Sequence, residues 1–230
     1  SRKNSCDKLL RIIHIRDTMS ISKQEFARRR KNLMALLEPG SIAIVPSASL
    51  RTRSRDSDYP FRQDSDFFYL SGFDEPEEVL VLLPGRPQGE YILFCRERDP
   101  AMELWDGYRA GPEGACAEYG ADDAFPIADI DDILPGLLEG RERVYYSLGR
   151  HAEFDQQVMH WVNTIRARVR QGAHPPGEFL DLDHFLHDLR LFKSPAELVA
   201  GTIKLAGTYR FPDPGLGSLA GATAVMGQML

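Results

Sequence analysis

The sequence has few cysteines and no long apolar run, and both shortages limit what the protein can be. Of its 230 residues three are cysteine, namely Cys6, Cys95 and Cys116. An odd and widely spaced set is neither a disulfide framework nor a zinc-binding motif. Free thiols suit a reducing compartment, so we expect a cytoplasmic location. No apolar run approaches the roughly 20 residues that a membrane-spanning helix needs, and we therefore expect no role within a membrane.

An excess of positive charge is also missing. The net charge is −6, which disfavours a nucleic-acid-binding function. Charge is unevenly spread, because residues 111–140 contain eight acidic side chains and no lysine or arginine. Basic residues gather instead at 28–31 and at 51–55, where we expect solvated helix and loop surface. No phosphate-binding glycine loop is present, since Gly215-Leu216-Gly217 is not followed by the rest of either known fingerprint.

Hydrophobic spacing predicts helices and strands mixed along the chain. A helix is expected to begin at Ser22, where Glu25 completes a capping box, and to stop at Pro39-Gly40, with residues 28–31 mostly facing solvent. Apolar runs predict strands at 41–46, 79–83, 91–95 and 143–148. A turn-like spacer joins the second and third of these as a hairpin. Further helices are predicted at 101–105, 112–119, 127–138, 154–170 and 182–189, and a last one begins with Ser194 as N-cap and Pro195 at its first position. This mixture predicts an α/β fold.

The two ends of the chain differ in texture from the rest. Residues 1–19 are interpreted as an N-terminal extension, with Met19 a possible natural initiator and too many charges nearby for a signal peptide. Residues 201–230 hold six glycines and no convincing periodicity. Ordering such a segment costs conformational entropy with little apolar burial in return, so we expect a disordered tail.

The segment Tyr59–Phe73, read as YPFRQDSDFFYLSGF, is the most informative part of the chain. A surface strand would alternate apolar and polar residues, and this segment does not. It mixes aromatic rings with Asp64, Asp66, Arg62 and Gln63 and then stops at a glycine. We interpret it as a buried corner with fixed polar partners.

This segment closely resembles the signature of the N-terminal domain of Xaa-Pro aminopeptidases, the aminopeptidase P family. Together with this segment, other motifs are similar to the family and occur in the expected order, over roughly residues 20–200. They are Glu25–Arg30, Arg62–Phe73 with Glu75–Glu77, Leu93–Asp99, Glu103–Gly107 and Leu189–Glu197. The resemblance implies the creatinase/aminopeptidase P N-terminal fold, a mixed β-sheet flanked by helices. It also implies an N-terminal domain at 20–178, followed at 179–200 by a linker and the start of a catalytic-domain helix.

The resemblance further implies a biochemical activity. Enzymes of this family release the N-terminal residue that precedes a proline, so peptides with proline at position two are the implied substrates. Two manganese ions, held by two Asp, one His and two Glu in a C-terminal domain, supply the hydrolytic chemistry. The N-terminal domain is implied to mediate homo-oligomer contacts and to restrict access to the cleft.

The metal ligands that the family requires should follow the motif at 189–197. The last thirty residues contain one aspartate, Asp213, and neither glutamate nor histidine. We therefore predict that the chain binds no metal and is inactive alone, and hypothesise a truncated or frame-shifted product or an incomplete gene. The alternative function is that of a stand-alone interaction module, which binds peptides or proteins without catalysis.

Trp105 is the candidate substrate-contacting residue of this chain. It matches a family tryptophan that reaches across to a neighbouring subunit and covers its active site. The alternative is a core or dimer-contact tryptophan. Arg170 is a weaker candidate for a substrate contact, because the match is ambiguous around Gly172.

Three other groupings favour structural roles. His184 and His187 have metal-ligand spacing, yet a helix end with one buried and one exposed histidine explains them as well. Asp64 and Asp66 could act as an acid/base pair, but we favour buried carboxylates that accept backbone hydrogen bonds or pair with Arg62. Serines at 54, 57 and 65 have no histidine nearby in sequence to complete a triad, although proximity in space stays open.

Overall fold

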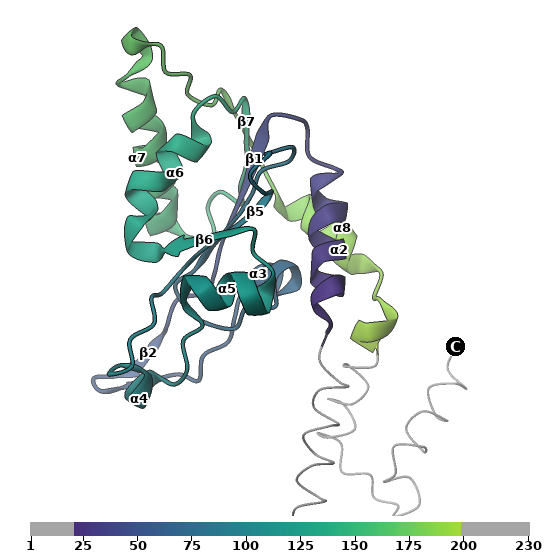
Figure 1. Cartoon of the computed structure of the whole chain (residues 1–230), viewed down its shortest axis with the longest axis vertical. Coiled ribbons are helices and arrows are strands. Elements are labelled where there is room, and N and C mark those ends of the chain that lie inside the picture. The colour runs from purple at the N-terminus through teal and green to yellow at the C-terminus, as the bar shows by residue number, and fades with distance from the viewer. Residues whose placement is uncertain (1–20, 199–230) are drawn as a thin grey trace, which may run out of the picture. The chain divides into compact units, whose positions relative to one another are not determined.

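The computed structural model describes residues 21–198 (Figure 1). Its helices are α2 (Lys23–Met34), α3 (Ser65–Ser71), α4 (Glu103–Asp106), α5 (Gly111–Tyr119), α6 (Ile130–Leu138), α7 (Ala152–Arg166) and α8 (Asp183–Leu191), with short 3₁₀ turns η1 (Ile127–Asp129) and η2 (Val169–Gln171). Its strands are β1 (Ser41–Pro46), β2 (Thr52–Ser54), β3 (Ser57–Asp58), β4 (Val79–Leu82), β5 (Tyr91–Cys95), β6 (Asp123–Pro126), β7 (Arg143–Tyr145) and β8 (Glu178–Leu180).

Six strands form one mixed sheet in the order β6-β5-β4-β1-β7-β8. Strand β4 is antiparallel to both of its neighbours, and every other pair is parallel. The carboxyl ends of the parallel strands therefore all lie on the same side of the sheet. The predicted hairpin is confirmed by the antiparallel pairing of β4 with β5, and the predicted α/β fold with a mixed sheet flanked by helices is confirmed as well.

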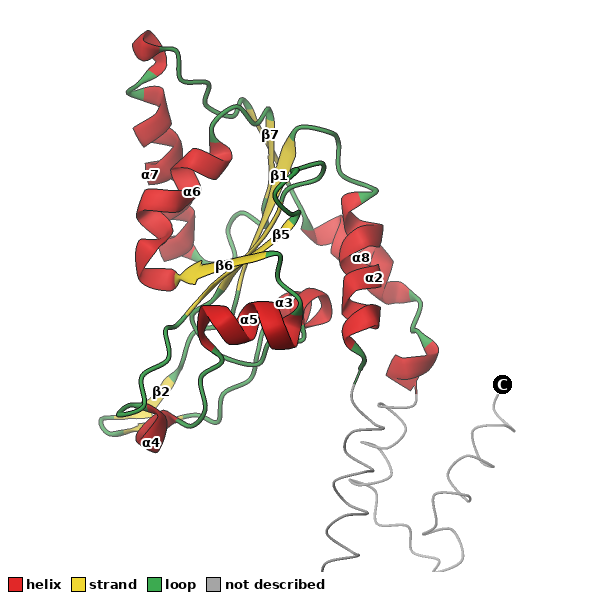
Figure 2. Cartoon of the chain, in the orientation of Figure 1, coloured by secondary structure: helices red, strands yellow, loops and turns green. Residues whose placement is uncertain are grey.

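Each face of the sheet carries its own hydrophobic core. On one face α2, α3, α5 and α8 cover strand side chains that include Leu80, Leu82 and Leu93. On the other face α6 and α7 cover a set that includes Ile44, Val81 and Phe94. Figures 1 and 2 show the sheet between these two helical layers. Because the central strands are buried on both faces, they are continuous apolar runs rather than alternating ones.

Several short elements were not predicted. Strand β6 reads Asp-Ala-Phe-Pro and β8 reads Glu-Phe-Leu, so neither offers an apolar run, and both exist through parallel pairing at the two edges of the sheet. The β2–β3 hairpin lies in a stretch taken for a loop. The predicted strand at 143–148 ends at Tyr145, and the long helix predicted at 154–170 ends at Arg166 before η2.

The prediction that residues 28–31 mostly face solvent was wrong for two of the four. Arg29 and Arg30 are buried, and their guanidinium groups donate to the carbonyl oxygens of Tyr69 and Leu70 at 3.1 and 2.8 Å. Those carbonyls belong to the last turn of α3, where no backbone donor follows within the helix. The two arginines of α2 therefore hydrogen-bond the C-terminal end of α3, and they also lie over the rings of Tyr69 and Tyr91.

Contact clustering places residues Lys23–Leu189 in one compact unit. After it, Ser194 is the N-cap as predicted, and it also forms a capping box with Glu197 through hydrogen bonds of 2.8 and 3.3 Å between side chains and backbone amides. The expectations about residues 1–19 and 201–230 lie outside the described residues, as does Cys6.

Candidate functional site

Trp105 lies on α4, a single helical turn in the connection between β5 and α5. Its side chain is 85% exposed, and that of Leu104 is equally exposed. Trp105 is therefore not a core tryptophan, unlike Trp161, which is 1% exposed. Arg170, the weaker candidate, is an exposed residue of η2 in another part of the sequence and the fold.

The start of α4 is held by a compact polar network. The Asp99 carboxylate accepts hydrogen bonds from the backbone amides of Ala101 and Met102 at 2.9 and 3.3 Å. The Glu103 carboxylate pairs with the Arg98 guanidinium at 3.2 Å. This hydrogen bond lowers the pKa of Glu103 and raises the pKa of Arg98. The backbone of this exposed turn is therefore held in a fixed conformation.

The end of α4 is fastened to the body of the domain. Gly107 has φ 88°, which favours glycine, and ends the turn with a hydrogen bond to the Glu103 carbonyl. The Tyr108 hydroxyl donates to Glu118 at 2.9 Å, and this hydrogen bond raises the pKa of Tyr108. At Ala110 the backbone amide donates to the buried carboxylate of Glu75 at 2.8 Å. These contacts fix where the exposed tip projects.

The apolar side chains of this connection form an exposed cluster, which we call the α4 tip: Met102, Leu104, Trp105 and Tyr108. Their exposed fractions run from 42% for Met102 to 85% for Leu104 and Trp105. Single exposed apolar residues are ordinary, whereas a group that includes a tryptophan and a tyrosine is typical of a protein-contact surface. The α4 tip is suited to burial against another molecule.

The signature segment 59–73 is organised around α3. Asp64 is the N-cap of α3, and its carboxylate accepts from the amides of Asp66 and Phe67 at 2.8 and 3.0 Å. The Gln63 side-chain amide donates to the carbonyls of Phe73 and Glu75 and accepts from the amide of Ala48. The prediction of a buried corner with fixed polar partners is confirmed for most of residues 63–73, whereas Tyr59, Pro60 and Arg62 are exposed. Asp64 has the structural role that we favoured.

Asp66 has a structural role too, but its predicted partner was wrong. Its buried carboxylate pairs with the Arg150 guanidinium at 2.9 Å, whereas Arg62 is exposed. Arg150 also reaches Asp183 at 3.2 Å, so that one arginine joins the start of α3 to the start of α8. Residue 150 lies 84 positions after residue 66, and nothing in the local sequence indicates this pairing.

A buried carboxyl group at Glu78 was missed by sequence analysis. Glu78 is 1% exposed, and within the described residues its Oε2 atom has no hydrogen-bond partner. Burial, together with the neighbouring Glu75 carboxylate, raises the pKa of Glu78 to about 9. A glutamate next to the strand Val79–Leu82 was the available signal, because a charge at the start of a buried strand needs an explanation.

The remaining groupings do not assemble into a catalytic site. The prediction of one buried and one exposed histidine was wrong, because His184 and His187 are both exposed. Among residues 21–198 no group of three or more His, Cys, Asp or Glu side chains could hold a metal ion. The described residues therefore do not fit the dinuclear metal centre that the resemblance implies for the whole enzyme. Ser54 and Ser57 hydrogen-bond to each other through their hydroxyl groups, at 2.6 Å.

A family model for the aminopeptidase P N-terminal domain matches residues 26–145, which include β1, α3, the central hairpin and the α4 tip. The chain belongs to this family. The Xaa-Pro aminopeptidase of Escherichia coli is 41% identical over 179 residues, covering 77% of this chain and 41% of that protein. Human Xaa-Pro aminopeptidase 3 is 34% identical over 195 residues, covering 79% of this chain and 37% of its own length.

Solved structures of the family agree with this fold. The structure of Pseudomonas aeruginosa aminopeptidase PepP superposes with a TM-score of 0.77 at 63% identity, over 78% of this chain and 41% of that one. Aminopeptidase P from Escherichia coli gives a TM-score of 0.76 at 40% identity, over 82% and 42% of the two chains. The chain thus spans about two fifths of the length of these relatives.

Three further findings concern membrane spans, the compartment of one relative and the metal of another. No helix among residues 21–198 is long and apolar enough to cross a membrane. A relative from Arabidopsis thaliana, 32% identical over 210 residues, is named intermediate cleaving peptidase 55, mitochondrial. One of the Escherichia coli structures is a zinc-substituted enzyme in complex with product, which places a metal in that relative.

Proposed function

We propose that this chain acts as the N-terminal domain of a manganese-dependent Xaa-Pro aminopeptidase of the cytoplasm. In this proposal the domain covers residues 20–178 and residues 179–200 lead toward a catalytic domain. The domain mediates homo-oligomer contacts and limits access of peptides with proline at position two. Because residues 21–198 offer no metal-binding cluster, the manganese ions and the bond-breaking chemistry belong outside them.

The observation that carries this proposal is the exposed α4 tip on a chain of this family. Trp105 presents a large, flat side chain on a turn that ion pairs and hydrogen bonds hold in place. An indole loses little conformational entropy when it is buried by a partner, and it covers an apolar ligand well. We propose that it covers the substrate's N-terminal residue in the active site of a neighbouring subunit.

The first test asks whether the chain cleaves peptides by itself. The purified 230-residue chain is incubated with an Xaa-Pro peptide and manganese, and release of the N-terminal residue is followed. We expect no turnover, because the described residues hold no metal site. Turnover that a chelator abolishes would contradict the proposal.

The second test addresses Trp105. Residues 21–198 replace the matching part of the Escherichia coli relative, and kcat/KM is measured for the chimera with and without Trp105→Ala. We expect a loss of about tenfold, the size typical of a central aromatic contact. Leu104→Ala is the matched control, because that side chain is equally exposed.

The α4 tip also supports a second function, that of a stand-alone interaction module that binds a partner without catalysis. The chimera separates the two functions. If Trp105→Ala lowers kcat/KM and Leu104→Ala does not, the tryptophan serves the enzyme. If neither substitution changes kcat/KM while the α4 tip still binds another protein, the interaction module is favoured.

A further inference from the structure

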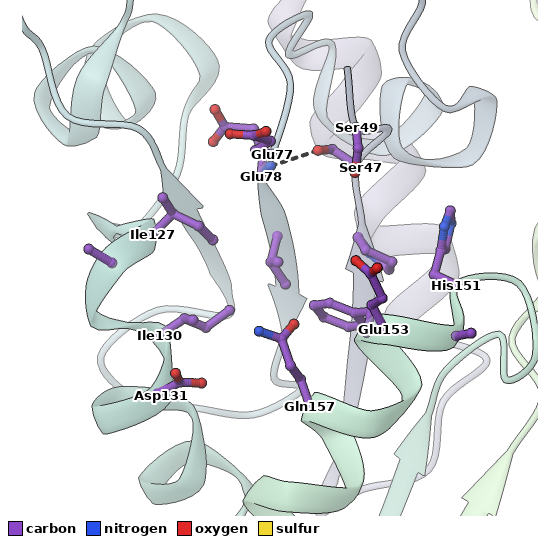
Figure 3. A pocket seen from close by; sticks show the side chains of 15 residues that line it. Ser47, Ser49, Glu77, Glu78, Ile127, Ile130, Asp131, His151, Glu153 and Gln157 are labelled. Carbon is purple, nitrogen blue, oxygen red and sulfur yellow. Dashed lines mark hydrogen bonds between the residues drawn. The ribbon is translucent and has the colours of Figure 1, made fainter. Parts of the chain in front are cut away.

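Two neighbouring hollows lie beyond the ends of the parallel strands. The larger has a volume of about 570 Å³ and the smaller about 370 Å³, and Ser49 and His151 line both. The larger hollow is bounded by Pro46 at the end of β1, by the start of β4 and by the first turns of α6 and α7 (Figure 3). In open α/β sheets, ligands bind outside the carboxyl ends of the strands. We call the two hollows together the sheet-end trough.

The larger half of the trough is acidic on apolar walls. Glu77, Glu78, Asp131 and Glu153 line it, and no lysine or arginine does. Burial raises the pKa of Glu78 to about 9, so the other three supply the negative charge. Figure 3 shows Glu77 and Glu78 just before β4, Asp131 on α6 and Glu153 on α7 around the hollow, with Ile127 and Ile130 on its wall. The Asp131 carboxylate accepts a hydrogen bond from the indole of Trp161 at 2.7 Å. Within residues 21–198 neither Glu77 nor Glu153 forms an ion pair.

The smaller half of the trough is basic. Arg51 and Arg62 line it together with Tyr59, and neither arginine forms an ion pair with the described residues. The one acid in this half, Asp64, already accepts two backbone hydrogen bonds as the N-cap of α3. A planar guanidinium group binds a carboxylate through two parallel hydrogen bonds.

Opposite charges thus line the two halves of one trough without pairing with each other. An uncharged or singly charged ligand would leave one half without a partner. We propose that the trough binds a short peptide with free termini, with its ammonium group among the carboxylates of the larger half and its carboxylate at the arginines of the smaller half. His151 and Ser49 lie between the two charged ends. The site uses none of the residues of the α4 tip, so it stands independently of the function proposed above.

The experiment measures binding of tri-alanine to the 230-residue chain by calorimetry, with chemically blocked peptides for comparison. N-acetylation removes the ammonium charge and C-terminal amidation removes the carboxylate charge. We expect each change to weaken binding about fivefold, the size of one partly exposed ion pair, and both together to weaken it further. Equal binding of all the peptides, or no binding of tri-alanine at millimolar concentration, would overturn the proposal, as would sensitivity to one terminus only.

Two charge-removing variants assign the ends. In Glu153→Gln the preference for the free N-terminus should fall while the preference for the free C-terminus remains. In Arg62→Gln the pattern should reverse. Glu142→Gln and Arg55→Gln are matched controls at exposed positions outside the trough and should bind like the parent chain. Variants that leave both preferences intact would overturn the assignment, and the blocked peptides test the parent chain even if a variant folds poorly.

Discussion

The α3 corner, as we call residues 63–73 around α3, and the α4 tip are both rich in aromatic residues. Both belong to motifs that carry the family resemblance, yet they differ in burial. In the α3 corner Phe67 and Phe73 are fully buried. Arg150 pairs with Asp66 at the start of α3, and Arg30 donates a hydrogen bond to the Leu70 carbonyl at its end. In the α4 tip Trp105 projects into solvent, and only the backbone and the flanking polar groups are fixed.

This difference separates residues that stabilise the folded chain from residues that are available to contact a partner. Substitutions in the α3 corner remove buried packing and hydrogen bonds, so they should be felt in the free energy of unfolding. Substitutions at the α4 tip remove little that the folded chain uses, and they should be felt only where a partner covers the tip. The following predictions test that separation, from the largest expected effect on stability to the smallest.

Arg30→Ala should break the α3 corner. The substitution leaves the Leu70 carbonyl without its buried donor and removes the cation–π contact with Tyr91. We expect a loss of about 3 kcal/mol in the free energy of unfolding, measured by urea denaturation. Arg28→Ala, on the same helix with a side chain 58% exposed, is the control and should change stability by less than about 0.5 kcal/mol. Similar losses for the two variants would show that Arg30 has no special role.

Gly72→Ala should strain the end of α3. Gly72 has φ 68°, and a Cβ atom there would lie 2.5 Å from the Phe26 ring. We expect a loss of about 2 kcal/mol, from the left-handed backbone and the clash together. Gly40→Ala is a close control, because φ is 75° and nothing lies within 4 Å of the added atom. Its loss should be only about 1 kcal/mol, and equal losses would mean that the Phe26 contact costs nothing.

Glu78→Gln should change how stability depends on pH. The pKa of Glu78 is raised from 4.5 to about 9, so between these values the folded chain keeps a proton that the unfolded chain has released. Raising the pH across this window therefore lowers the free energy of unfolding of the parent chain. The variant should lose this dependence and be more stable by about 1 kcal/mol at pH 8. In the exposed neighbour, Glu77→Gln should change the dependence only slightly, because the Glu77 charge is the smallest of the causes that raise the pKa of Glu78. An unaltered profile in Glu78→Gln would contradict the prediction.

Trp105→Ala should have the smallest effect on stability, below about 0.5 kcal/mol, because its side chain is 85% exposed. Thermal unfolding of the isolated chain measures this. Trp161→Ala is the contrasting variant, since that indole is buried and should cost at least about 3 kcal/mol. A large destabilisation by Trp105→Ala would erase the distinction between the α4 tip and the α3 corner.

Much of the fold could be predicted because it depends on local patterns. Runs such as Ser41–Pro46 and Tyr91–Cys95 are apolar throughout and are strands in the structure. The edge strands β6 and β8 could not be predicted, because pairing with a neighbour rather than composition makes them strands. The α4 connection was recognised by resemblance, but the exposure of its tip arises because no other segment of residues 21–198 covers it, which no local pattern reports.

The sequence was enough to predict the central strands, the polar corner within residues 59–73 and membership of the aminopeptidase P N-terminal family. Apolar runs, capping residues and an ordered series of motifs are properties of neighbours along the chain. The folded structure was needed to show that Arg29 and Arg30 are buried, that Asp66 pairs with Arg150, and that acidic and basic residues line the sheet-end trough. These contacts are between segments that are far apart in the sequence. Each buried charge needs its partner because helices cover both faces of the sheet and exclude water.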